Sequence, residues 1–223
     1  MFITVCGQKG GVAKTCTSIH LASVWHSEGK KVCIVDADKN RSALAYSSRG
    51  NLQFPVFPVS SAAKASRSSD IVITDGQASS DQEELKHLAY GSDLVILPTT
   101  AKARSVELTV ELASLLSNLK VNHAVMIVKV DFRQQKAAQQ AKNALENFGL
   151  FVFDKFIPLL SAFDKAEASG SSVFEAVDDL GRSDPRRMTG WSAYCSIASQ
   201  IPCLISKNSS NTNNLNNQRP ISA

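Results

Sequence analysis

The chain has 223 residues, of which 43% are hydrophobic and 20% charged, and its formal net charge is +4. This composition is typical of a globular protein with one full-sized core, and it excludes collagen-like and low-complexity chains. The five cysteines are irregularly spaced and form no C-x-x-C pair, which argues against a disulfide framework or a zinc site. No run approaches about 18 apolar residues, and no basic region precedes an apolar run at the start. We therefore expect neither a transmembrane helix nor a signal peptide.

Short β-branched runs alternate with helix-like stretches along most of the chain. The predicted strands are Phe2–Cys6, Lys31–Val35, Asp70–Thr74, Asp93–Leu97, Ala124–Val130 and Phe151–Ile157. The predicted helices are Thr15–Ser27, Asp81–Tyr90, Ser105–Leu119 and Gln134–Phe148. Most of the strands are continuously apolar, as in parallel strands buried on both faces. Alternating strands and helices predict an α/β fold, a three-layer α/β/α sandwich with a mostly parallel central sheet.

Two segments depart from this alternation. Pro55–Ser69 is rich in Ser and Ala, and we interpret it as a short strand followed by a connector. Near the C-terminus, the uncharged stretch Met188–Ser206 is predicted to be a last helix that packs on the sheet. After Lys207 the composition changes to Asn and Ser. Because such a segment buries too little apolar surface to offset its ordering entropy, we expect one domain over 1–207 and a disordered tail over 208–223.

The most informative segment is the loop G-Q-K-G-G-V-A-K-T, which occupies residues 7–15. It follows a predicted strand and opens a predicted helix, the context of a phosphate-binding loop. Glycines let backbone N–H groups turn toward phosphate oxygens, and a helix N-terminus adds a positive dipole. Lys14 would place its charge on the β- and γ-phosphates, and the Thr15 hydroxyl could ligate Mg²⁺. The strand before the loop and the helix after it disfavour the alternative, a glycine-rich turn with incidental lysines.

Carboxylates end two of the predicted strands. Asp36 and Asp38 follow one apolar strand, and Asp75 follows another. Ligands of open α/β sheets bind at the carboxyl ends of the strands, where a carboxylate can orient a water molecule or hold hydrated Mg²⁺. A lone aspartate there could instead cap a helix, but two of them after this loop favour function.

The loop lacks the standard G-x-x-x-x-G-K-[ST] pattern and instead fits K-G-G-x-x-K-T. In this it resembles the ParA/MinD family of deviant Walker A ATPases, most of all the short plasmid-partition ParA proteins. The resemblance covers roughly residues 1–180 and implies a P-loop NTPase fold that binds ATP and Mg²⁺. It assigns Lys9 as the signature lysine that reaches the nucleotide of a second subunit. The implied nucleotide-binding residues are Gly10, Gly11, Val12, Ala13, Lys14, Thr15, Cys16 and Pro158.

The same resemblance assigns the carboxylates. Asp38 would be needed for hydrolysis and Asp36 would support it, while Thr15, Asp75 and Asp38 would hold the metal. The chain departs from the family pattern at three places. Ala13 stands where glycine is usual, and its methyl group fits there if φ is negative. Lys39-Asn40 replaces Pro-Gln, and Val128 replaces the common asparagine on the side of the base.

The resemblance implies an ATP-driven dimerisation switch, and the leading hypothesis is partition of plasmid or chromosomal DNA. A homodimer formed with ATP would bind nonspecific DNA, and a ParB-like adaptor would stimulate slow hydrolysis. Arg182, Arg186 and Arg187 are the predicted DNA contacts, with a solvated charged loop as the alternative. The Asn/Ser tail argues against a membrane partner, so we expect a cytoplasmic, nucleoid-associated protein.

Other functions stay open. The same machinery could position another cytoplasmic cargo, such as carboxysomes. A nucleotide-binding scaffold that does not hydrolyse ATP is a further alternative, although Lys9, Lys14 and Asp38 speak against it. A metabolic ligase or a nitrogenase-reductase-like enzyme is the third, but no suitable cysteine spacing for an iron–sulfur cluster appears.

Overall fold

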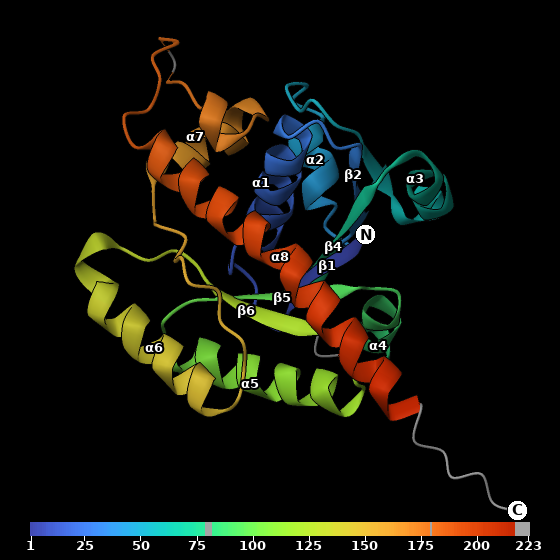
Figure 1. The fold of residues 1–223 in the computed structure, drawn as a ribbon. Coiled ribbons are helices and arrows are strands. Elements are labelled where there is room, and N and C mark those ends of the chain that lie inside the picture. Colours follow the sequence, from blue (N-terminus) through green and yellow to red (C-terminus); the bar gives the residue numbers. More distant parts are fainter. Residues whose placement is uncertain (79–81, 179, 217–223) are drawn as a thin grey trace, which may run out of the picture.

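The computed structural model describes residues 1–78, 82–178 and 180–216 (Figure 1). Its strands form one sheet in the order β3-β2-β4-β1-β5-β6, and every neighbouring pair is parallel. The strands are β1 (Phe2–Gly7), β2 (Val32–Ala37), β3 (Val56–Pro58), β4 (Ile71–Ala78), β5 (Leu94–Thr99) and β6 (His123–Ile127). The predicted parallel sheet is confirmed, and β3 is the short strand expected within Pro55–Ser69.

Helices cover both faces of the sheet, which confirms the three-layer architecture (Figure 1). One face is covered by α1 (Lys14–Ser27), α2 (Ser42–Ser47) and α8 (Arg187–Asn216), with α7 (Ser161–Ser169) beside them. The other face is covered by α3 (Ala62–Ser68), α4 (Gln82–Tyr90), α5 (Ala103–Asn118) and α6 (Gln135–Asn147). Side chains of a strand alternate between the two cores: Ile34 packs with α1, and Cys33 packs under α3.

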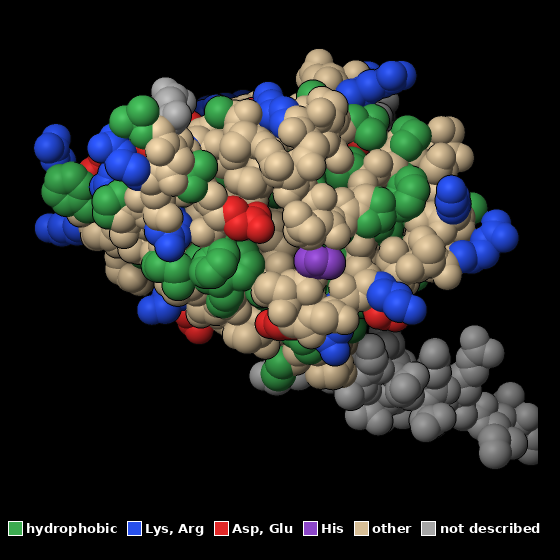
Figure 2. Space-filling view, turned by 90° about the horizontal axis from the view of Figure 1, so that it is seen from above, with side chains coloured by type: hydrophobic (Ala, Val, Ile, Leu, Met, Phe, Trp, Pro, Cys, Tyr) green, Lys and Arg blue, Asp and Glu red, His purple; other side chains and the backbone are tan. Residues whose placement is uncertain are grey.

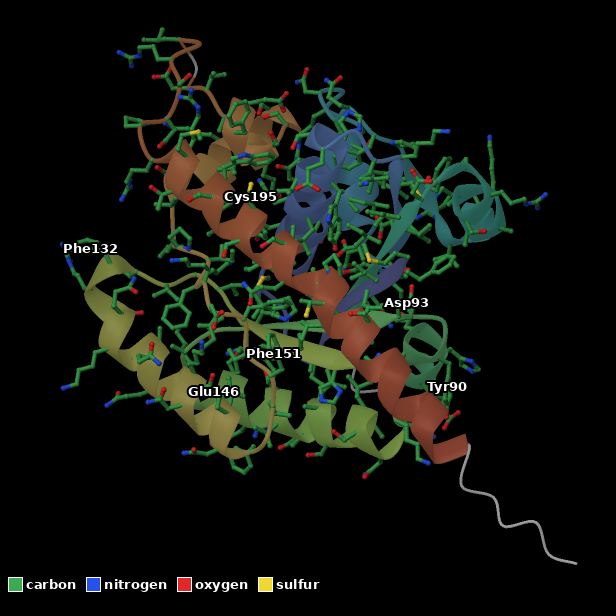
Figure 3. All side chains as sticks on the ribbon, in the orientation of Figure 1. Tyr90, Asp93, Phe132, Glu146, Phe151 and Cys195 are labelled. Carbon is green, nitrogen blue, oxygen red and sulfur yellow. The ribbon has the colours of Figure 1, made fainter. Side chains whose placement is uncertain are left out.

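The strand predicted over Phe151–Ile157 is wrong. This segment meets β6 and the residues after it only at two isolated bridges, Val125 with Val152 and Val130 with Pro158. Asp154 and Lys155 between these bridges are exposed, and β6 itself ends at Ile127. Because Lys129 then turns the chain with φ 56°, the ladder cannot continue along this edge. Figure 3 shows Phe151 at the start of this segment, beside α6.

Three short 3₁₀-helices, η1 (Val59–Ser61), η2 (Phe132–Gln134) and η3 (Val173–Glu175), lie in the connections. The last helix, α8, runs on through Asn216, past the end predicted at Ser206. The first part of the tail predicted to be disordered is therefore helical, consistent with the cooperativity of helix propagation. Residues 217–223 and Asp81 lie outside the described residues. No helix in the described part of the chain is long and apolar enough to span a membrane.

Candidate nucleotide-binding site

The loop between β1 and α1 is open on its outer side. A Cβ atom added at Gly10 or Gly11 would meet no atom within 4 Å, and Gly11 has a φ of 76°. Ala13 caps α1 with φ 60° and ψ 34°, in the left-handed region. The negative φ under which the methyl group would fit without strain is therefore not found. Ala13 occupies a conformation that suits glycine, at a cost of about 1–2 kcal/mol.

Lys14, the first residue of α1, points back over the loop. Its Nζ atom lies 3.5 Å from the backbone oxygen of Lys9, and the side chain is buried. Burial lowers the pKa of this ammonium, while the nearby carboxylates Asp75 and Asp38 oppose that shift. A partly desolvated cation above an open glycine loop is suited to bind an anion.

Asp75, within β4, lies behind the loop and is fully buried. Its two oxygens accept hydrogen bonds from the Thr15 hydroxyl at 2.7 Å and from the Ser18 hydroxyl at 2.9 Å. Burial raises the pKa of this carboxyl to about 7, and the two hydrogen bonds act in the opposite direction. Sequence reasoning missed Ser18, although its i+3 spacing from Thr15 on one helix was a usable signal.

Asp36, within β2, and Asp38, just after this strand, have different positions. Asp36 is buried, and its oxygens accept the backbone N–H groups of Asp38 at 3.0 Å and Leu44 at 2.8 Å. Asp38 lines the cavity in front of the loop, which is called the main cavity below, and one of its oxygens accepts the N–H of Asn40 at 2.8 Å. Asp36 thus positions the loop that carries Asp38, and Asp38 is the carboxylate that faces the cavity.

A cavity of about 420 Å³ lies in front of the loop. The expected site residues that line it are Gly10, Gly11, Ala13, Lys14, Thr15, Cys16, Asp38 and Pro158. Its far wall comes mainly from the late part of the chain, and it includes Ile157 and Glu167, which lie in segments that resemble the part of the family that closes over the base. Sequence reasoning did not anticipate the following lining residues: Tyr46, Gln77, Lys129, Leu160, Phe163 and Asp164. The hydroxyl and carboxylate oxygens of Thr15, Asp38 and Asp75 suit Mg²⁺, and Lys14 suits phosphate, so the residues present fit a magnesium nucleotide.

A second cavity, of about 630 Å³, adjoins the first. Lys9 and Val12 line this second cavity and not the first, whereas Gly10 and Gly11 line both. Lys9 and Lys14 therefore line different cavities, although the Lys14 ammonium lies 3.5 Å from the backbone oxygen of Lys9. Among the residues that line the second cavity, Asp131 is acidic, and its carboxylate accepts the backbone N–H of Arg133 at 2.9 Å.

Two residues considered for contact with a base or a nucleotide, Val128 and Cys16, pack against other parts of the protein. Val128 is fully buried in the core beneath α1, so its side chain does not reach the cavity. Cys16 lines the cavity, and its sulfur lies 3.7 Å from the hydroxyl of Tyr194. Burial raises the pKa of the Cys16 thiol to about 12, which keeps it protonated.

The three arginines proposed for DNA lie away from both cavities. Arg182 is exposed, and its Nε atom donates to Asp178 at 2.8 Å. Arg186 is exposed, and Arg187 is partly buried. Within the described residues, the Nε atom of Arg187 is buried without a hydrogen-bond partner. These arginines therefore do not form one uniformly available basic surface.

A family model described as the CobQ/CobB/MinD/ParA nucleotide binding domain matches residues 3–173. The maintenance of carboxysome distribution protein A of Gloeobacter kilaueensis is 27% identical over 183 residues, which cover 78% of this chain and 83% of that protein. The MinD cell division protein of Aquifex aeolicus superposes with a TM-score of 0.70 at 14% identity, covering 90% of this chain and 96% of that chain. A Borrelia burgdorferi protein assigned to plasmid partition and bound to AMPPNP gives 0.65 at 17% identity, with 92% and 98% covered. The likeness to solved structures establishes the fold, and the family match over most of the chain shows that this protein belongs to the CobQ/CobB/MinD/ParA family of nucleotide-binding domains.

Proposed function

We propose that this protein is an ATP-dependent dimerisation-switch ATPase that partitions plasmid or chromosomal DNA. The observation that carries the proposal is the hydrogen-bonded group Thr15–Asp75–Ser18 beneath an open glycine loop that Lys14 covers. In this arrangement the Thr15 hydroxyl and the Asp75 carboxylate are placed to hold a hydrated Mg²⁺, and the Lys14 ammonium is placed to bind phosphate.

Bound Mg-ATP would supply the phosphoanhydride bond that is hydrolysed. Lys14 would hold the phosphates, and Thr15 together with Asp75 would hold the metal. One oxygen of Asp38 is engaged by the Asn40 N–H, and the carboxylate still faces the cavity. Asp38 is thus placed to orient a water molecule and accept its proton, which is the role proposed for it.

The position of Lys9 supports a homodimer. Lys9 lines the second cavity, on the other side of the loop from Lys14, so it is free to reach the nucleotide of a second subunit. Phe132 beside this cavity is 70% exposed, with the Arg133 guanidinium 5.0 Å from its ring centre, and Figure 3 shows it at the outer end of α6. An exposed aromatic residue next to a basic cavity suits a surface that a second copy covers.

Dimerisation is tested by measuring the mass of the protein in solution with ATP and Mg²⁺, with ADP, and without nucleotide. Wild type should dimerise only with ATP, and Lys9→Ala should stay monomeric while it still binds ATP. Lys30→Ala, which removes an exposed lysine just after the C-terminal end of α1, is the matched control. A Lys9→Ala variant that dimerises as wild type does would refute the role of Lys9 across the interface.

Nonspecific DNA binding is the second part of the proposal. On the face that Figure 2 shows, Lys and Arg side chains lie mainly around the edges. One subunit has few free arginines and can make too few contacts with DNA phosphates, whereas a dimer doubles the number of these contacts. DNA binding should therefore need ATP and fall steeply with salt. A shift assay across a salt series tests this. Arg186→Glu with Arg187→Glu should lose DNA, whereas Lys64→Glu with Arg67→Glu on α3, the same change of charge, should retain it.

A second candidate function is the distribution of a protein cargo in the cytoplasm. The similarity to a carboxysome distribution protein favours it. Both functions use an ATP-dependent dimer on the nucleoid, and they differ in the adaptor. Cross-linking of the ATP-bound dimer in cells distinguishes them: a ParB-like adaptor bound to a DNA site supports partition, and an adaptor bound to a protein assembly supports cargo distribution. Absence of any ATP turnover with either adaptor would leave a nucleotide-binding scaffold.

A further inference from the structure

The two cavities share a wall. Gly10, Gly11, Lys129 and Leu159 line both of them, and of these four residues Lys129 alone carries a charge. Lys129 is exposed, and no carboxylate of the described residues lies within ion-pair distance of its ammonium. A cation without a partner therefore stands beside the phosphate-binding loop, across the cavity from α1.

The backbone of Lys129 is strained. Its φ of 56° is in the left-handed region, which lysine rarely adopts. Its neighbours are tied down on both sides: the N–H of Val128 donates to Thr99 at 2.8 Å, and the N–H of Val130 donates to Ile157 at 3.0 Å. Residues persist in such conformations when the surroundings impose them, and they gather at ligand-binding sites.

Lys129 changes the net formal charge of the residues that line the main cavity. Lys14 and Lys129 line the cavity together with three acidic residues, Asp38, Asp164 and Glu167, so the formal lining charge is 2 − 3 = −1. Without Lys129 the charge would be 1 − 3 = −2. Because a nucleotide diphosphate or triphosphate is itself strongly anionic, each cation in the wall matters for its binding.

We propose that Lys129 is a third lysine of the nucleotide site, which contacts the phosphates of the nucleotide bound by its own subunit. The inference rests on the proposed function, because it presupposes that a nucleotide occupies this cavity. The phosphates would then be contacted both by the loop between β1 and α1 and by Lys129 on the opposite side of the cavity. Such a contact also accounts for a strained residue that neither the strand pattern nor the core requires.

Titration calorimetry with ADP and with ATP, at protein concentrations below those of dimerisation, tests the proposal. Lys129→Ala should weaken both nucleotides by on the order of tenfold, the loss expected for one charge-assisted contact. Lys129→Arg should retain most of the affinity. The matched control is Lys102→Ala, which removes the same charge from the second cavity alone and should leave the affinity unchanged.

A fourth variant separates binding from folding. Lys129→Gly removes the charge and relieves the left-handed strain, so it should unfold at a higher temperature than Lys129→Ala while binding nucleotide equally weakly. Wild-type affinity in Lys129→Ala or Lys129→Gly would overturn the inference and leave the proposed function intact. An equal loss in Lys102→Ala would also overturn it, because the effect would then be a general one of charge. A wild-type protein that binds neither ADP nor ATP would overturn the proposed function and this inference with it.

Discussion

The two walls of the main cavity are built in different ways. The early wall, from the loop, β2 and β4, consists of polar groups held by specific hydrogen bonds, such as those of Asp75 with Thr15 and Ser18. The late wall, formed by Lys129 and by residues within 157–167, is largely apolar and rests on packing: Leu160 belongs to a small core beneath α7. From this difference we expect the early wall to provide the polar groups for phosphate and metal, and the late wall to set the shape and charge of the space for a ligand.

The largest effect should come from the early wall. Lys14→Ala removes the ammonium that covers the loop, and we expect the affinity for ATP and ADP to fall by more than about a hundredfold, with turnover lost as a consequence. Titration calorimetry measures this directly. Affinity within threefold of wild type would mean that the late wall, not the loop, provides most of the binding.

Asp38→Ala should separate chemistry from binding within the same wall. The variant keeps Lys14 and Thr15, so it should bind ATP about as wild type does. Turnover should fall by on the order of a hundredfold or more, because the carboxylate that faces the cavity is gone. A phosphate-release assay measures turnover, and the mass of the protein in solution with ATP shows whether the ATP-bound dimer accumulates, as we expect. Unchanged turnover would remove Asp38 from the mechanism.

The early wall could be predicted from sequence because each of its parts is local. The loop, the helix it opens and the strand-end aspartates are short patterns, and a parallel sheet brings strand ends together at one edge. The family resemblance, and not the pattern, assigned different roles to Asp36 and Asp38. Neither could give the backbone N–H groups that Asp36 accepts, because those depend on the folded path of the loop after β2. The left-handed φ of Ala13 was hidden because it depends in the same way on the folded path of the loop before α1.

The late wall could not be predicted in this way. Its apolar run suggested a seventh strand, yet the turn at Lys129 interrupts the ladder, and only two bridges form. Asp164 looks like an ordinary surface residue of a short helix in the sequence. It becomes a cavity residue because α7 packs beside α1, a long-range contact without a local signature.

His20 of α1 offers a way to weaken the contact between α1 and the late part of the chain. Its Nε2 atom accepts the N–H of Val173 at 3.0 Å, its Nδ1 lies 2.6 Å from the Cys16 oxygen, and its ring packs edge-on against Phe163. Burial lowers the pKa of His20 to about 4, so the folded state binds fewer protons than the unfolded state between pH 4 and 6.5. Stability from this residue is therefore present above pH 6.5 and lost as the pH falls toward 4, roughly 2 kcal/mol of it between pH 7.5 and 5.

Urea unfolding at pH 7.5 and pH 5 checks this expectation. His20→Gln should be less stable than wild type at pH 7.5, and its stability should change less between the two pH values. His26→Gln, an exposed histidine on the same helix, is the control and should keep the wild-type pH dependence. Equal pH dependence in wild type and His20→Gln would show that this histidine does not couple the late wall to α1 in the neutral form.

The smallest effect tests a feature that both walls share, a residue other than glycine in the left-handed region: Ala13 in the early wall and Lys129 in the late one. Ala13→Gly should stabilise the protein by roughly 0.5–1 kcal/mol, because relief of about 1–2 kcal/mol of strain exceeds the added entropy of the unfolded chain. The matched control is Ala22→Gly, in the buried helical part of α1, which should cost about 1 kcal/mol or more. Urea unfolding of both variants at pH 7.5 should thus give opposite signs. If Ala13→Gly also destabilises, the methyl group contributes more through its packing against the core than its backbone conformation costs, and the strain in the early wall is then smaller than its φ implies.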